Sequence, residues 1–174
     1  TMTEETEVVR EEIIPGVARA LSPLLRRILV AGIAEGEGTN TYLVGIDEIA
    51  VVDPGPIDAE HLRSITGCGG DCIRWVLCTT VDEHHAAGAV ALKEATGAEI
   101  LMPPGVKGVV KDGTIAPGAT IVGTEFRLTT HAAPGLAPKN LMYFLEEERV
   151  LIPGRLMSEE SDVAVSAPGG DVAA

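Results

Sequence analysis

The apolar positions of the chain fall into short runs, which are separated by polar or Gly/Pro-rich breaks. Residues 39–45 alternate polar and apolar side chains, as a half-buried strand does, and residues 49–53 form a continuous apolar strand. The short turn between them predicts that the two strands pair as a hairpin. The same kind of pattern predicts a strand that ends in a turn within residues 13–17, and further strands at residues 24–33, 73–79, 99–102, 126–131, 140–145 and 150–152.

Two segments carry the signals of helices. Asp58 is placed to cap a helix over residues 59–66, and an Ala-rich helix over residues 86–96 ends at Gly97. His61 lies on the first of these helices, where we expect a solvated surface histidine. Strands and helices alternate along this middle part of the chain, which predicts parallel strand pairing with right-handed crossovers. Beyond residue 120 the pattern is that of β-hairpins, so the sequence predicts an α/β fold.

The polar break between the strand at residues 73–79 and the following helix is the strongest candidate for a functional site. It contains two of the chain's four histidines, His84 and His85, next to Asp82. A polar cluster at the carboxyl end of a buried strand, ahead of a helix, is where α/β folds bind their ligands.

The sequence in and around this polar segment resembles that of the metallo-β-lactamase superfamily, whose signature is Thr-His-x-His-x-Asp-His-x-x-Gly. In register with it are Leu77, Thr79, His85 and Gly88. The upstream stretches Asn-Thr-Tyr-Leu-Val-Gly and Val-Val-Asp-Pro-Gly-Pro are also similar to sequences of the family. The resemblance implies an αββα sandwich of two mixed sheets over residues 24–174. It also implies an N-terminal segment at residues 1–23 and a C-terminus that is shorter than usual.

The family's usual activity is metal-dependent hydrolysis of esters, thioesters, amides or phosphodiesters. Such a zinc site needs imidazoles and carboxylates that converge on the metal and leave one position for water. By the resemblance, His85 is the one ligand that this chain retains. The other ligand positions hold Thr80, Asp82, His84, Leu136 and Arg155. The resemblance also puts Asp53 beneath the metal site as a supporting carboxylate; an aspartate that caps the next turn is an equal alternative.

Three functions stay open at this point. The first is a metal-free homologue that is not a hydrolase in the usual sense, in which the charge of Arg155 replaces the metal and pairs with Asp53 or Asp82. The second is a hydrolase with an atypical single-zinc site built from Asp82, His84 and His85, with His131 as an open further candidate. The third is a structural or partner-binding subunit. No cofactor is expected unless the single-zinc alternative holds, and the sequence identifies no small-molecule ligand.

Composition narrows the partners and the location. A formal net charge of −13 argues against nucleic acid and anionic membranes, because both require a basic face. No apolar run approaches the roughly 20 residues of a membrane span, and the acidic N-terminus is unlike a signal peptide. The odd number of cysteines indicates a reducing cytoplasm, with Cys68 and Cys72 as ordinary thiols. The shortened end would expose apolar residues near 163–165, so we expect a homodimer unless residues 3–20 cover them.

Overall fold

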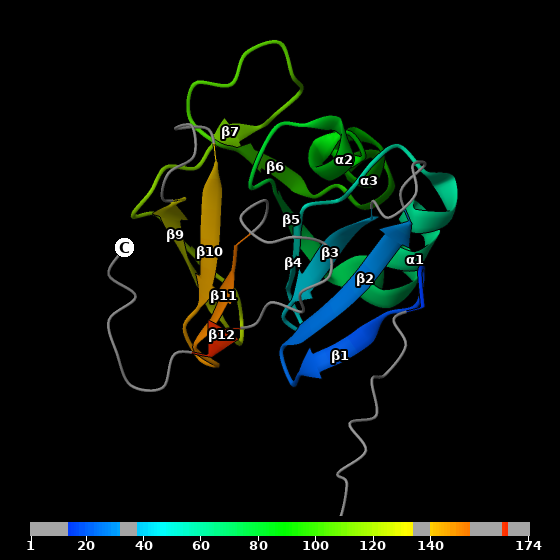
Figure 1. Ribbon diagram of the computed structural model, residues 1–174, viewed down its shortest axis with the longest axis horizontal. Helices are drawn as coiled ribbons and strands as arrows, with labels where there is room; N and C mark the ends of the chain where they lie inside the picture. The colour runs from blue at the N-terminus through cyan, green and yellow to red at the C-terminus, as the bar shows by residue number, and fades with distance from the viewer. Residues whose placement is uncertain (1–13, 32–37, 134–139, 154–164, 167–174) are drawn as a thin grey trace, which may run out of the picture.

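The computed structural model describes residues 14–31, 38–133, 140–153 and 165–166. These residues form two β-sheets that pack face to face, with the helices on the outer face of the larger sheet (Figure 1). The α/β sandwich that the resemblance implied is therefore confirmed.

The larger sheet contains seven strands in chain order. Strands β1 to β4 pair antiparallel and strands β4 to β7 pair parallel, which confirms the predicted hairpin and the predicted parallel pairing. Every residue of β4 is buried, because one face of this strand packs on the second sheet and the other on the helices. The strands are β1 Arg19–Ser22, β2 Leu25–Ala31, β3 Gly38–Val44, β4 Ile49–Val52, β5 Ile73–Leu77, β6 Glu99–Met102 and β7 Gly113–Thr114.

The smaller sheet has the strand order β12-β11-β10-β9-β8, and each strand runs antiparallel to its neighbour. Its β9 alternates in burial, with Leu128 and Thr130 pointing inward. The strands predicted for the second half of the chain are confirmed. The bounds are β8 Thr120–Val122, β9 Arg127–Ala132, β10 Leu141–Leu145, β11 Val150–Ile152 and β12 Val165–Ser166.

Part of the expected N-terminal segment belongs to the larger sheet. Within residues 1–23, β1 pairs with β2 through Arg19 opposite Arg27. The turn predicted within residues 13–17 is confirmed at Pro15 and Gly16, whereas Ile14, ahead of the turn, is not in a strand as predicted. Gly16 has a φ of 78°, which favours glycine, and its N–H donates to the Leu29 carbonyl at 2.8 Å.

The helices lie between the strands of the larger sheet in sequence. Helix α1, Ala59–Gly69, begins at Asp58 as predicted, and a single 3-10 turn, η1 Gly70–Cys72, follows it. The Ala-rich helix predicted at residues 86–96 is instead two helices, α2 Glu83–Ala86 and α3 Ala89–Thr96. The helix is interrupted next to Gly88 because the loop after β4 lies against the backbone at this residue. A Cβ on Gly88 would lie 3.0 Å from the Pro56 carbonyl oxygen and 3.1 Å from that of Gly55.

Two apolar clusters hold the layers together. The first fills the space between the sheets and includes Phe126 and Tyr143. The second lies between the larger sheet and the helices and includes Ile65 and Leu92. Because both clusters use the larger sheet, the ends of its central strands are fixed from both sides. None of the helices in the described ranges is long and apolar enough to cross a membrane.

Candidate functional site

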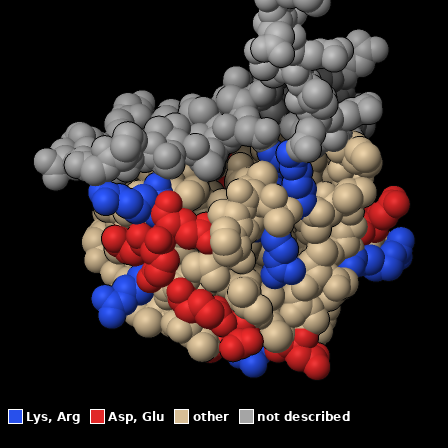
Figure 2. Space-filling view, turned by 90° about the horizontal axis from the view of Figure 1, so that it is seen from below, with Lys and Arg blue, Asp and Glu red and all other residues tan. Residues whose placement is uncertain are grey.

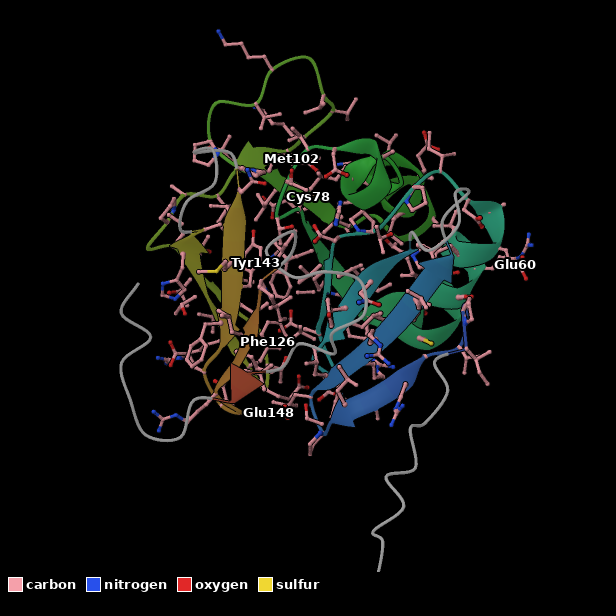
Figure 3. The ribbon with its side chains drawn as sticks, viewed as in Figure 1. Glu60, Cys78, Met102, Phe126, Tyr143 and Glu148 are labelled. Carbon is pink, nitrogen blue, oxygen red and sulfur yellow. The ribbon has the colours of Figure 1, made fainter. Side chains whose placement is uncertain are left out.

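The candidate site lies at the carboxyl ends of β4 and β5. Asp53 follows β4 directly, and a short polar segment leads from β5 into α2. Cys78 marks this end of the molecule in Figure 3, and Glu148 marks the opposite end. The smaller sheet is hydrogen-bonded to the segment that follows β5. The Leu141 N–H at the start of β10 donates to the Thr79 carbonyl at 2.8 Å.

Asp53 is the central carboxylate of this site, and it is only 2% exposed. Its carboxylate accepts hydrogen bonds from the Thr79 N–H at 2.8 Å and from the Thr79 hydroxyl at 2.7 Å. Its backbone has a φ of 55°, a left-handed conformation that non-glycine residues seldom adopt and that is often found at functional sites. Burial raises the pKa of Asp53 to about 6, against the opposing effects of His85 and of the bonds from Thr79. The carboxylate therefore fastens the end of β5 to the end of β4.

Asp82 and His85 form a second polar pair at the start of α2. One oxygen of Asp82 accepts the His85 backbone N–H at 3.1 Å and lies 2.7 Å from Nδ1 of the same residue. Both side chains are half-buried. Because Asp82 engages Nδ1, it fixes the orientation of the imidazole, and Nε2 is the nitrogen left to face other groups. An imidazole held in this way can exchange a proton or bind a metal, depending on what Nε2 meets.

The structure brings Asp53, Asp82 and His85 to the same end of the larger sheet, as the sequence predicted. Thr80 lies there too and is 4% exposed. Three predicted positions fall outside what the structure describes: the side chain of His84, and residues Leu136 and Arg155. The expected pairing of Arg155 with the carboxylate of Asp53 or Asp82 stays a prediction. Among the described side chains, no group of three or more His, Cys, Asp or Glu residues is placed to hold a metal ion.

The prediction that His61 is a solvated surface histidine is wrong, because its side chain is only 3% exposed. His61 shares the buried side of α1 with Ile65, which lies one helical turn further along. Its Nε2 lies 2.8 Å from the hydroxyl of Thr41 on β3. The spacing of four between His61 and an apolar residue on the same helix is the signal that could have revealed its burial.

Two buried hydroxyl groups lie on the inner face of the smaller sheet. Tyr143 on β10 and Thr130 on β9 are opposite each other in the sheet, and both are 0% exposed. Neither hydroxyl has a hydrogen-bond partner within the described ranges. Burial raises the pKa of Tyr143 well above its usual value, with smaller contributions from Cys78 and Asp53. The interior near the site therefore contains polar groups in an otherwise apolar layer.

Comparison with other sequences gives one informative relative. No protein-family model matches the chain. It is 31% identical over 121 residues to hydroxyacylglutathione hydrolase from Anaeromyxobacter dehalogenans (strain 2CP-C), in an alignment that covers 68% of this chain and 46% of that protein. The chain thus spans just under half the length of this curated relative.

Solved structures share the arrangement of the two sheets. A metallo-β-lactamase with a HARLDQ motif from Cronobacter sakazakii has a TM-score of 0.66 at 16% identity, over 80% of this chain and 61% of that one. The flavodiiron protein from Giardia intestinalis has a TM-score of 0.67 at 17% identity, over 79% and 39% of the two chains. The subclass B3 metallo-β-lactamase MEM-A1, from a soil metagenome library, has a TM-score of 0.62 at 14% identity, over 76% and 58%. At these identities the likeness defines the fold, and the chemistry has to be argued from the residues.

Proposed function

Given its metallo-β-lactamase fold, we propose that this chain is a metal-free homologue of the superfamily's hydrolases and does not hydrolyse substrates in their usual way. The observation that carries the proposal is the position of Thr80. This threonine is buried in the segment that follows β5, at the position where the resemblance puts the first metal-binding histidine. A threonine hydroxyl is not among the ligands that zinc ordinarily takes in proteins.

The described residues fit a catalytic zinc poorly. Such a metal takes three protein ligands and keeps a position for water. Both carboxylate hydrogen bonds of Asp53 go to Thr79, and an oxygen of Asp82 is bonded to the ring of His85. That pair therefore leaves at most Nε2 of His85 and the second oxygen of Asp82 for a metal, which is short of three protein ligands. The remaining family positions, Leu136 and Arg155, carry neither an imidazole nor a carboxylate.

One observation supports the alternative of a single-metal hydrolase. The contact between Asp82 and His85 is the carboxylate–histidine pair that commonly orients a metal-binding imidazole. In that alternative His85 is the ligand, Asp82 is its orienting partner rather than a ligand, and His84 is the further ligand that the sequence suggested.

Metal content decides between these two functions. We expect protein purified without chelator, then incubated with excess zinc and dialysed, to hold well below one equivalent of zinc, iron or manganese by elemental analysis. Ester, thioester and phosphodiester substrates should show no turnover above buffer with or without added zinc. A stoichiometric metal that survives dialysis and is lost in His85→Ala would overturn the proposal.

The third function, a structural or partner-binding subunit, is compatible with a metal-free site. The homodimer expected from the sequence is its simplest form. Sedimentation equilibrium at micromolar concentration tests for this homodimer. A dimer mass supports self-association, and the mass of a single chain contradicts it.

A further inference from the structure

His61 lies under the segment that carries Asp53. This segment, the Asp53 loop, comprises residues 53–57 and joins β4 to the cap of α1. The ring of His61 packs so closely on it that a Cβ added to Gly55 would lie 3.1 Å from Nε2. The Thr41 hydroxyl lies between the ring and the loop, at 2.8 Å from Nε2 and 2.6 Å from the Asp53 carbonyl oxygen. His61 therefore supports the loop both directly and through Thr41.

These two contacts identify the proton on the imidazole ring. A hydroxyl has one hydrogen to donate, and a carbonyl oxygen can only accept. Thr41 must therefore donate to the Asp53 carbonyl and accept from His61, so Nε2 carries the hydrogen. Nδ1 is then the deprotonated nitrogen of a neutral ring.

A second proton on His61 would be poorly accommodated. It would sit on Nδ1, which is buried and has no hydrogen-bond partner within the described residues. A buried N–H without an acceptor, on a ring that also becomes charged, is strongly unfavourable. Burial lowers the pKa of His61, and this effect exceeds the opposing effects of the charge of Asp58 and of a hydrogen bond to the Pro54 carbonyl.

The Asp53 loop connects His61 to the candidate site through backbone hydrogen bonds. The Gly55 N–H donates to the His85 carbonyl at 2.9 Å, and the Gly88 N–H donates to the Gly55 carbonyl at 2.8 Å. These bonds join the loop to the region where α2 ends and α3 begins. A displacement of the loop by His61 would break both of them.

The charged groups around His61 do not provide the missing acceptor. Asp58 is committed to capping α1 through the His61 N–H, and the carboxylate of Asp53 is bonded to Thr79. The charged groups on the other elements that pack nearby have their own partners: Arg26 on β2 with the Cys68 carbonyl, Lys93 on α3 with Asp112, and His85 on α2 with Asp82.

We propose that His61 is a proton-operated latch, which holds the Asp53 loop against the α2–α3 junction while the ring is neutral and releases it when the ring is protonated. The release exposes the loop beneath His85 at mildly acidic pH. It requires no metal and no substrate, so it stands whether or not the proposed function is correct.

The amides of Gly55 and Gly88 report the latch directly, because both bond across the loop junction. We expect their hydrogen-exchange protection factors to fall between about pH 7.5 and about pH 5, by roughly tenfold for each unit by which the pKa of His61 is lowered on folding. Protection factors remove the intrinsic pH dependence of exchange. The amide of Gly97, which caps α3 through the Lys93 carbonyl at 2.7 Å, serves as the internal control and should stay constant.

The variant His61→Gln separates the latch from other titrations, because its amide can donate to Thr41 and does not titrate. In this variant the protection of Gly55 should become independent of pH. An unchanged fall in the variant, or no fall in the wild type, would overturn the proposal. If the variant does not fold, the NMR titration of the His61 ring in the wild type replaces it. The fall in Gly55 protection must then level off near the midpoint of the ring titration, and a fall that levels off at a clearly different pH is equally decisive against the latch.

Discussion

The two ends of the sandwich use carboxylates in opposite ways. Figure 2 shows the end away from the site, where Asp and Glu side chains gather over part of the surface. At this end, two glutamates in turns of the smaller sheet form hydrogen bonds to the larger sheet. Glu148, between β10 and β11, accepts the Leu24 N–H at 2.8 Å and also the Ser22 hydroxyl. Glu125, before β9, accepts the N–H groups of Ile46 and Asp47 at 3.1 Å and 2.7 Å. These contacts between the sheets are made by partly exposed glutamates, which accept backbone N–H groups and one hydroxyl.

At the site end, the corresponding carboxylate is buried and stays within one sheet. Asp53 binds Thr79 on the neighbouring strand, and burial raises its pKa to about 6. By contrast, hydrogen bonds, chiefly from the Asp47 N–H, lower the pKa of Glu125. The bonds that Glu148 and Glu125 make between the sheets thus involve none of the predicted metal positions that the structure describes. Substitutions at those positions would therefore leave these bonds between the sheets intact.

The largest effect should come from removing the buried carboxylate. Asp53→Ala leaves the Thr79 N–H and hydroxyl without their acceptor and leaves an alanine at a positive φ. We expect a loss of about 3 kcal/mol in the free energy of unfolding. Asp53→Asn retains an acceptor and tolerates the backbone conformation, so its loss should be about 1 kcal/mol. Urea unfolding measures both, and equal losses would show that the carboxylate does not fasten the strand ends.

The opposite pKa shifts predict opposite responses to pH. The pKa of Asp53 is raised on folding, so its stabilising contribution is full below the unfolded value near 4 and is lost as the pH rises through about 6. Relative to Asp53→Asn, the wild type should therefore lose about 2 kcal/mol between about pH 4 and pH 7. The pKa of Glu125 is lowered, so its contribution is present above the unfolded value and is lost as the pH falls through the lowered pKa. Urea midpoints for Glu125→Gln across the acid range should converge with those of the wild type, and a parallel pair of profiles would contradict this.

Many of the strands and helices could be predicted from the sequence, because the patterns that specify them lie within a few neighbouring residues. The hairpin of β3 and β4 follows from alternation and a turn, and the start of α1 follows from Asp58. The break between α2 and α3 could not be predicted from helix propensity. It depends on Gly88 meeting the carbonyl groups of a loop that is more than 30 residues away in sequence.

The site could be predicted only in part, for the same reason. The resemblance correctly located Asp53, Asp82 and His85 at one end of the larger sheet. The burial of His61 was missed because a histidine beside Glu60 looks polar in a local window. Its place is decided by Thr41, which is 20 residues earlier and lies on another element. Hydrogen bonds between elements carry no local pattern, and they are what distinguishes this site from a generic strand end.

A smaller effect on stability is expected at Glu148, at the end of the molecule away from the site. Glu148→Gln keeps the size of the side chain but weakens its charge-assisted bonds to Leu24 and Ser22, so we expect a loss of about 1 kcal/mol. Glu94→Gln, on an exposed position of α3, is the matched control for loss of one negative charge and should change the stability by less than about 0.5 kcal/mol. Chemical denaturation at neutral pH compares the two. An equal effect of both variants would mean that net charge, rather than the joint between the sheets, determines the change.

The smallest effect should come from Tyr143, which lies between the two ends. Its hydroxyl is buried without a partner in the described part of the chain, whereas its ring fills the apolar layer between the sheets. Tyr143→Phe keeps the ring and removes a group that loses its hydrogen bonds to water on folding. We therefore expect the variant to be as stable as the wild type or up to about 1 kcal/mol more stable. Thr130→Val tests the facing hydroxyl in the same way. Thermal unfolding of the two single variants and of the double variant measures the effect. A loss above about 1 kcal/mol in Tyr143→Phe would show instead that the hydroxyl has a partner, such as an internal water, and that the interior below Asp53 is hydrogen-bonded to the site rather than merely packed beneath it.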